Sequence, residues 1–192
     1  MILPIVAYGS PVLRKVCDEI TPGYPGLDNL IADMWETLYN SNGVGLAAPQ
    51  VNVPIRLFMI DSQQIFENQE EDEKDDYPDA PGYKGVFINA HITKINGKEW
   101  AYNEGCLSIP KIREDVYRNE EVTIEYDDEN FVAHSKTFNG ITARVILHEY
   151  DHIEGKLFID YIKPLKRKLL KRKLDDISKG KIKVDYRMLF PK

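Results

Sequence analysis

The sequence predicts an α+β fold, in which largely antiparallel sheets pack around a central helix, with one further helix on each side of them in the chain. Three observations support this class. Strand-favouring segments dominate the middle of the chain, helical periodicity flanks them, and the two do not alternate in the βαβ rhythm of a parallel sheet. The central helix is expected between Gly140 and Gly155.

The N-terminal part of the chain predicts one helix followed by one strand. Apolar side chains recur at helical spacing over residues 27–39, and the pattern stops near Asn42 and Gly43. The apolar positions are Leu27, Leu30, Ile31, Met34, Trp35 and Leu38. Residues 54–61, PIRLFMID, are mostly apolar and predict a buried strand.

Two hairpins and a C-terminal helix are expected in the rest of the chain. Asn96-Gly97 is a typical two-residue hairpin turn, which would join strands at 86–95 and 98–103. A second turn at 127–130 would join the segments EVTIEY and FVAHSKTF. Beyond the central helix, residues 163–178 are expected to form the last helix.

Length and composition predict one globular domain over residues 1–192, with 43% apolar residues. The net charge of −6 argues against a general nucleic-acid binder, and no specific DNA partner is expected. Only two cysteines are present, which favours a reducing, cytoplasmic location over a secreted disulfide scaffold. No apolar run approaches the ~20 residues that cross a bilayer, so no membrane partner is expected.

Three charged or polar segments are expected at the surface. Residues 62–85 are predicted to be an acidic insertion, because six acids lie between positions 70 and 76. Residues 163–176 are dense in Lys and Arg, which indicates either a solvated helix face or docking to ribosomal RNA. Residues 179–192 alternate like a strand, and are expected either to pack on a sheet edge or to contact a partner.

A metal site is indicated by His148 and His152, which are four residues apart on the expected central helix. Side chains at i and i+4 lie on one helix face, so both imidazoles can reach one ion. Glu149 is rotated by about 100° from His148, where its carboxylate can act as a general base on water. Asp151 is either a solvent-facing acid or a buried carboxylate paired with Arg118.

The third ligand is absent from the positions that the two usual H-E-x-x-H protease arrangements use. The C-terminal helix offers only Asp175 and Asp176, and Phe158 occupies the place of a third histidine. Upstream, Cys106 is a candidate, because a thiolate and two imidazoles leave a fourth position open for water. Cys17 is expected to be a small buried hydrophobe.

The segment GVGLAAPQ, residues 43–50, is rich in small side chains and leaves its backbone accessible. An extended peptide can lie against such a backbone as an additional strand. Gln50 at its end offers an amide donor. Alone, this segment is a weak indication of a peptide site, because turns rich in Gly and Ala are common.

Together, GVGLAAPQ, EGCLS and HEYDH, in this order, resemble the three signature segments of the peptide deformylase family, and the resemblance covers residues 2–175. It implies a metal-dependent hydrolase that removes the formyl group from the N-terminal formyl-methionine of newly synthesised polypeptides and releases formate. It also implies one Fe²⁺ per chain, which Zn²⁺, Ni²⁺ or Co²⁺ can replace.

The resemblance implies three groups of site residues. The metal ligands would be Cys106, His148 and His152. Glu149 would be the acid and base, and Gln50 and the backbone N–H of Leu107 would stabilise the oxyanion. The methionine pocket and peptide track would include Gly43, Val44, Gly45, Glu104, Gly105, Ile141, Arg144 and Val145, with Arg113 near the mouth. Arg144 departs from the family pattern, which often has an apolar residue there, and its charge is expected to reach water.

Two other functions fit parts of the pattern. A zinc peptidase would use the same H-E-x-x-H helix and the same base, but this sequence lacks the third ligand that such peptidases usually have. A non-catalytic metal-binding protein would not need Glu149 or Gln50, and a structural site usually fills its fourth position with protein. Hydrolysis of an unformylated peptide would favour the first of these, and a fourth protein ligand would favour the second.

Overall fold

The computed structural model describes residues 1–67 and 79–191, so the acidic run at 70–76 lies outside the described residues. The helical elements are η1 (Pro11–Arg14), α1 (Leu27–Asn40), η2 (Ala48–Val51), α2 (Gln63–Glu67), α3 (Gly140–Ile153), η4 (Phe158–Tyr161) and α4 (Pro164–Ser178). The strands are β1 (Ile5–Val6), β2 (Gly45–Ala47), β3 (Leu57–Asp61), β4 (Lys84–Cys106), β5 (Ile109–Asp127), β6 (Ala133–Asn139) and β7 (Met188–Leu189). The fold is α+β, as predicted.

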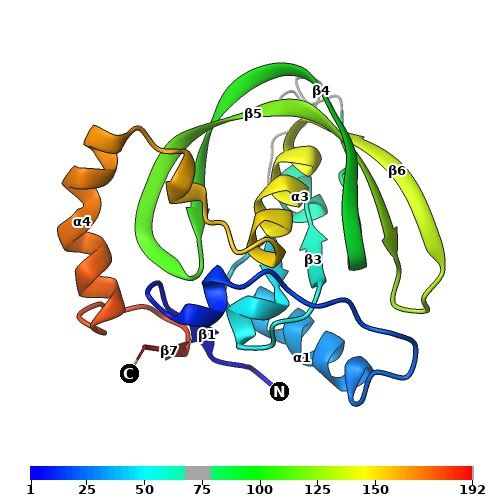
Figure 1. Cartoon of the computed structure of the whole chain (residues 1–192), viewed down its shortest axis with the longest axis horizontal. Helices are drawn as coiled ribbons and strands as arrows, with labels where there is room; N and C mark the ends of the chain where they lie inside the picture. Colours follow the sequence, from blue (N-terminus) through cyan, green and yellow to red (C-terminus); the bar gives the residue numbers. More distant parts are fainter. Residues whose placement is uncertain (68–78, 192) are drawn as a thin grey trace.

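The main sheet has five strands in the order β2-β3-β4-β5-β6, and all neighbouring strands are antiparallel. Figure 1 shows β4 and β5 as long curved ribbons that arch over α3, with α1 at one end of the molecule and α4 outside the arch. The predicted strand at 54–61 is β3, although it begins at Leu57. The helices predicted at 27–39, between Gly140 and Gly155, and at 163–178 are α1, α3 and α4.

The hairpin predicted at Asn96-Gly97 is wrong, because β4 continues through both residues. The register between β4 and β5 shifts between Asn96 and Glu99, so the Asn-Gly pair forms an irregularity within the strand rather than a turn. Gly97 has the positive φ of 75° that a turn would need, and a bulge can use the same conformation. Bulges bend a strand, and four such shifts accompany the curvature of β4 around α3.

The actual turn between β4 and β5 lies eleven residues later, at Leu107 and Ser108. The second hairpin is confirmed, since β5 ends at Asp127 and β6 begins at Ala133. Tight turns at both ends of β5 therefore hold three consecutive strands in one sheet.

Helix α3 occupies the middle of the core, and eleven of its fourteen residues are buried. A helix that is buried on nearly every side must pack against apolar groups from several elements. Phe58 of β3 and Phe87 of β4 stack at 4.7 Å between ring centroids in the same cluster as Ile141 and Val145. The core thereby fixes the helix that carries both histidines.

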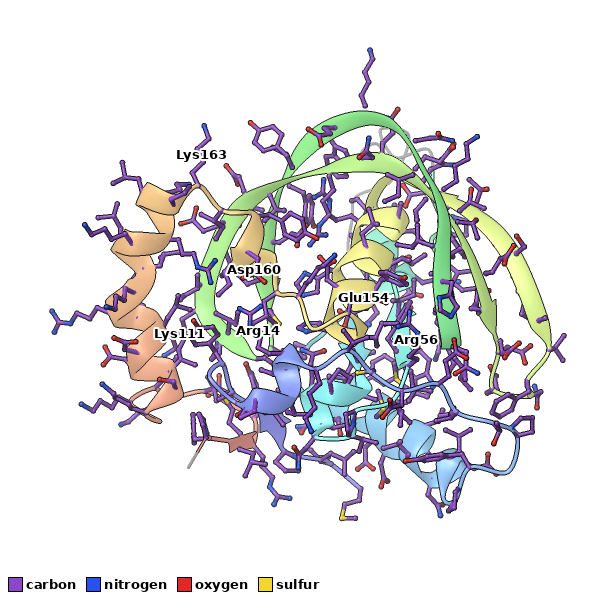
Figure 2. All side chains as sticks on the ribbon, in the orientation of Figure 1. Arg14, Arg56, Lys111, Glu154, Asp160 and Lys163 are labelled. Atoms are coloured by element: carbon purple, nitrogen blue, oxygen red, sulfur yellow. The ribbon has the colours of Figure 1, made fainter. Side chains whose placement is uncertain are left out.

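Two ion pairs hold the segment that follows α3, and Figure 2 labels their four residues. Arg56 Nη1 lies 2.7 Å from the Glu154 carboxylate, and Arg56 is itself buried. Arg14 of η1 pairs with Asp160 of η4 at 2.5 Å, just after α3. These contacts tie the segment that follows α3 to the N-terminal part of the chain.

The tail after α4 does not join the five-stranded sheet. Instead, β7 pairs in parallel with β1, with Ile5 opposite Met188 and Val6 opposite Leu189. The prediction of strand-like pairing is confirmed, but the partner is the first strand of the chain. In the part of the chain that the structure describes, no helix is long and apolar enough to span a membrane.

Candidate metal centre

Three candidate metal ligands meet at the end of β4 and on one face of α3. The ligand atoms of Cys106, His148 and His152 all lie within 4.8 Å of one another. Cys106 is the last residue of β4, and its Sγ lies 3.3 Å from His152 Nε2. The two histidines are separated by one helical turn, as their spacing predicted. One sulfur and two nitrogen donors form a set that suits Fe²⁺, Co²⁺, Ni²⁺ or Zn²⁺.

The histidine rings are arranged as metal ligands require. Glu104 Oε2 lies 2.9 Å from His148 Nδ1, so Nδ1 donates to this carboxylate and Nε2 remains available as a ligand. Burial lowers the pKa of His152 well below its ordinary value, which favours the neutral imidazole that binds metal ions. The donor set therefore fits a metal ion.

Glu104 is at the centre of a buried polar network. Its carboxylate accepts hydrogen bonds from Arg118 Nε at 2.7 Å and from Arg144 Nη1 at 2.9 Å, besides that from His148. Burial opposes ionisation of Glu104, but the contacts with His148 and Arg118 hold its pKa well below the usual range. Arg118 also pairs with Asp151, so the prediction of a buried Arg118–Asp151 pair is confirmed.

The expectation that the charge of Arg144 reaches water is wrong. Arg144 is only 1% exposed, and its guanidinium donates to the carbonyls of Trp100 and Val116 as well as to Glu104. A buried cation requires such partners, because its desolvation would otherwise be unfavourable. Direct contact of Glu104 and Arg144 with a substrate stays a prediction, although both line the pocket described below.

Glu149 lies beside the cluster in an apolar environment. It is 4% exposed, and burial raises its pKa to about 7 despite the opposing effect of His148. A carboxylate with a pKa near neutrality can both accept and return a proton. Gly45 in β2 borders this carboxylate so closely that a Cβ at position 45 would clash with Glu149 Oε1. The glycine therefore lets the backbone of β2 approach the acid.

Gln50 presents its amide group toward Cys106 and the turn that follows it. Its Oε1 accepts the backbone N–H of Ala47 at 2.8 Å, which orients Nε2 toward Ser108 Oγ at 3.3 Å and Cys106 Sγ at 3.5 Å. Gln50 is 2% exposed, so its amide is held in place before any ligand arrives. Leu107 lies in the turn between β4 and β5, between Cys106 and Ser108, the two residues that the Gln50 amide contacts.

A cavity of about 730 Å³ opens onto the centre. Eight of the predicted pocket residues line it, namely Gly43, Val44, Gly45, Glu104, Gly105, Arg113, Arg144 and Val145. So do Gln50, Cys106, Leu107, His148 and Glu149. Ile141 is not among the lining residues, because it is buried in the core cluster around Phe58 and Phe87.

Part of the cavity wall was missed by sequence reasoning. The cavity is also lined by four residues of the tail, Lys183, Val184, Asp185 and Tyr186. The strand-like alternation of the tail indicated that it packs against the protein, but nothing local indicated where. The arrangement as a whole can bind a metal ion, move a proton with Glu149 and hold an extended ligand along β2.

The comparisons with known proteins agree on one family. The family model described as polypeptide deformylase matches residues 2–168. The peptide deformylase of Flavobacterium johnsoniae is 57% identical over 190 residues, which cover 99% of this chain and 96% of that protein. The peptide deformylase of Christiangramia forsetii is 54% identical over 191 residues, which cover 100% of this chain and 97% of that protein.

Solved structures give the same result for the fold. The crystal structure of a peptide deformylase from Legionella pneumophila matches with a TM-score of 0.78 at 35% identity. The match covers 94% of this chain and 98% of the other. The structure of the Thermotoga maritima peptide deformylase matches with a TM-score of 0.72 at 33% identity, covering 85% and 99% of the two chains.

Proposed function

The chain belongs to the polypeptide deformylase family and is a metal-dependent hydrolase that removes the formyl group from the N-terminus of new polypeptides; from this premise, we propose which residues do so. We propose that Cys106, His148 and His152 hold one metal ion. The observation that carries the proposal is the convergence of their ligand atoms within 4.8 Å. Two of the three, Cys106 and His148, line the same cavity as Glu149 and Gln50.

Each catalytic group has a separate task in the proposed mechanism. When bound, the metal ion supplies Lewis acidity that brings the pKa of a water ligand near neutrality. Glu149 accepts the proton of the attacking water and later returns it to the amine that leaves. The Gln50 amide and the Leu107 N–H donate hydrogen bonds to the oxyanion that develops on the formyl oxygen. Glu104 orients His148 through its Nδ1.

Substrate binding is proposed along β2 and the turn after β4. The formyl-methionyl end would enter the cavity beside Val44, Val145 and Leu107, which provide apolar contacts for the methionine side chain. The backbone of residues 43–45 would pair with the extended peptide as an additional strand. Arg113 at the wall donates to Asn103 Oδ1 at 3.0 Å and would lie near the more distal substrate residues.

The metal is proposed to be Fe²⁺, with one ion per chain, and Zn²⁺, Ni²⁺ or Co²⁺ as replacements. The sulfur and nitrogen donors bind all four ions, and affinity alone ranks Zn²⁺ above Fe²⁺. Affinity therefore does not select iron, and the proposal rests on the family to which the chain belongs.

A secondary proposal concerns where the enzyme acts. We infer a cytoplasmic, single catalytic domain over residues 1–192, with 62–85 as an insertion. The basic face of α4 supports docking to ribosomal RNA, because its Lys and Arg side chains between positions 163 and 173 are exposed. Docking there would bring the enzyme to emerging chains.

The decisive experiment compares formate release from formyl-Met-Ala-Ser with amide hydrolysis of the same peptide without the formyl group. The metal-loaded enzyme is expected to release formate and to leave the unformylated peptide intact. Cleavage of the unformylated peptide would instead support the zinc peptidase that the H-E-x-x-H motif also allowed. The Glu149→Gln variant serves as the control for contaminating activity.

A further inference from the structure

The turn between β4 and β5 is held from three directions. It consists of Leu107 and Ser108, directly after the ligand Cys106. The Ser108 carbonyl accepts the backbone N–H of Tyr8 at 2.8 Å, and Ser108 Oγ accepts the Gln50 amide at 3.3 Å. The third contact comes from the tail, where the Tyr186 hydroxyl donates to the Leu107 carbonyl at 2.8 Å.

The third contact is notable because of its sequence distance. Tyr186 lies 79 residues beyond Leu107 and outside the residues 2–168 that the family model matches. It is held in place by the pairing of β7 with β1, and the backbone N–H of Ile5 donates to the Arg187 carbonyl at 2.8 Å. The hydroxyl is therefore presented by an anchored backbone rather than by a loose end.

Leu107 lies between the two strands, so the ladder of the sheet does not fix its carbonyl. Rotation of one peptide group in a turn changes the direction of its neighbour, because both share the dihedral angles of the residue between them. A hydrogen bond to the Leu107 carbonyl therefore also restricts the direction of the Leu107 N–H. Oxyanion donors are effective only when their direction is fixed in advance.

We propose that Tyr186 is a positioning residue of this enzyme: its hydroxyl holds the Leu107 carbonyl and so aims the Leu107 N–H at the oxyanion. The inference deepens the proposed function and rests on its assignment of Leu107. It makes the tail part of the active site, since Tyr186 and its neighbours Lys183, Val184 and Asp185 also line the cavity.

The test is the variant Tyr186→Phe, which keeps the ring and removes only the hydroxyl. The expected result is a fall in kcat of about five- to tenfold, smaller than the ~10²–10³-fold cost of deleting an oxyanion donor, with KM within about twofold of the wild type. Thermal stability and metal content should stay at wild-type levels, and so should the visible spectrum of the Co²⁺-loaded enzyme, which reports the ligand set around Cys106.

The matched control is Tyr126→Phe, which also removes a single tyrosine hydroxyl. In the wild type this hydroxyl lies 2.8 Å from the Tyr83 hydroxyl, and it takes no part in the proposed site. Tyr126→Phe should leave kcat unchanged. Equal kcat values for the two variants would overturn the proposal, as would a loss of activity in Tyr186→Phe that follows a loss of metal or of stability. If the wild type itself releases no formate, the proposed function fails instead, so the two failures are distinguishable.

A second variant tests the contribution of the tail as a whole. A chain that ends at Lys181 lacks both the hydroxyl and the wall of residues 183–186. Its kcat is expected to fall at least as far as that of Tyr186→Phe, and its KM to rise as well. Wild-type kcat in the folded, truncated chain would overturn the proposal.

Discussion

Arg118 donates from Nη1 to Asp151 Oδ2 over 2.6 Å, and both side chains are buried. The contact joins β5 to α3 at the residue before the candidate ligand His152. The same guanidinium also binds Glu104, the carboxylate that accepts from His148. One cation therefore holds both α3 and the residue that orients one of its histidines.

Removing the Asp151 carboxylate should destabilise the protein. Asp151→Ala removes one of the two carboxylates, Asp151 and Glu104, that pair with the buried Arg118, and breaking a buried pair on one side costs about 3–5 kcal/mol. Asp151→Asn should cost less, because its amide oxygen still accepts from Arg118. Urea unfolding measures the unfolding free energy of both variants. The control is Asp175→Ala, at an exposed position of α4. Equal unfolding free energies for Asp151→Ala and Asp175→Ala would contradict the structural role.

Glu149 should be needed for turnover but not for metal binding. Glu149→Ala is expected to keep one metal ion per chain and to lose about 10²–10⁴-fold in kcat, as for a missing general base. We expect a loss at or beyond the upper end of this range, since the same group would also protonate the leaving amine. Metal analysis and formate release are measured on the same sample. A variant that turns over near the wild-type rate would exclude Glu149 from this role.

Gly45 should be intolerant of any side chain. A Cβ there would clash with the Glu149 carboxylate, so Gly45→Ala is expected to displace the acid and lower kcat by about 100-fold, as small misplacements of catalytic groups do. The effect should disappear in a Glu149→Ala background, because the displaced group is then absent. Additive losses in the double variant would show that Gly45 acts by another route.

Metal exchange tests the choice of ion. One metal-free preparation, reloaded under argon, is expected to be most active with Fe²⁺, less active with Ni²⁺ or Co²⁺, and least active with Zn²⁺. The Fe²⁺ form should decay in air, since both the ion and the Cys106 thiolate can be oxidised. Formate release and the ion content of each sample are measured together. Equal rates with Zn²⁺ and Fe²⁺, or full activity of Cys106→Asp with Fe²⁺, would refute this assignment.

Docking to the ribosome should depend on α4 and on salt. Lys168, Lys171 and Arg172 are suited to charge reversal, because Lys166 and Arg167 already pair with Glu114 and Asp160. Replacing Lys168, Lys171 and Arg172 by Glu should abolish co-sedimentation with ribosomes at low salt. Added salt should steeply weaken ribosome binding by the wild type. Charge reversal at the exposed Lys94 and Lys98 of β4 is the control. Co-sedimentation that survives the α4 substitutions would exclude this surface.

The sequence predicted that the three candidate ligands meet, because the signals for them are local or fixed by a motif. Helical spacing alone placed His148 and His152 on one face, and the thiolate of Cys106 was expected from the segment around it. The Asn96-Gly97 turn failed for the opposite reason. Its local preference for a positive φ is real, but long-range pairing of β4 with β5 decides whether the residue becomes a turn or a bulge.

The contact between Tyr186 and Leu107 had no such local signal. Residue pairs that meet across 79 positions leave no periodicity in the sequence, so only the three-dimensional structure reveals them. The buried position of Arg144 was missed for a related reason. Besides Glu104, its partners are backbone carbonyls of β4 and β5, and a carbonyl acceptor is present at every position of any sequence.

The pairing of β1 with β7 has a consequence for how the enzyme matures. The partners Ile5 and Met188 are separated by almost the whole chain, and closing so long a loop is among the slowest contacts that a fold makes. The strand that anchors the cavity wall, β7, follows all the other strands of the described residues in the chain. We therefore expect this pairing, and the part of the cavity wall that it anchors, to form later in folding than the local turn between β4 and β5, where Cys106 pairs with Ile109.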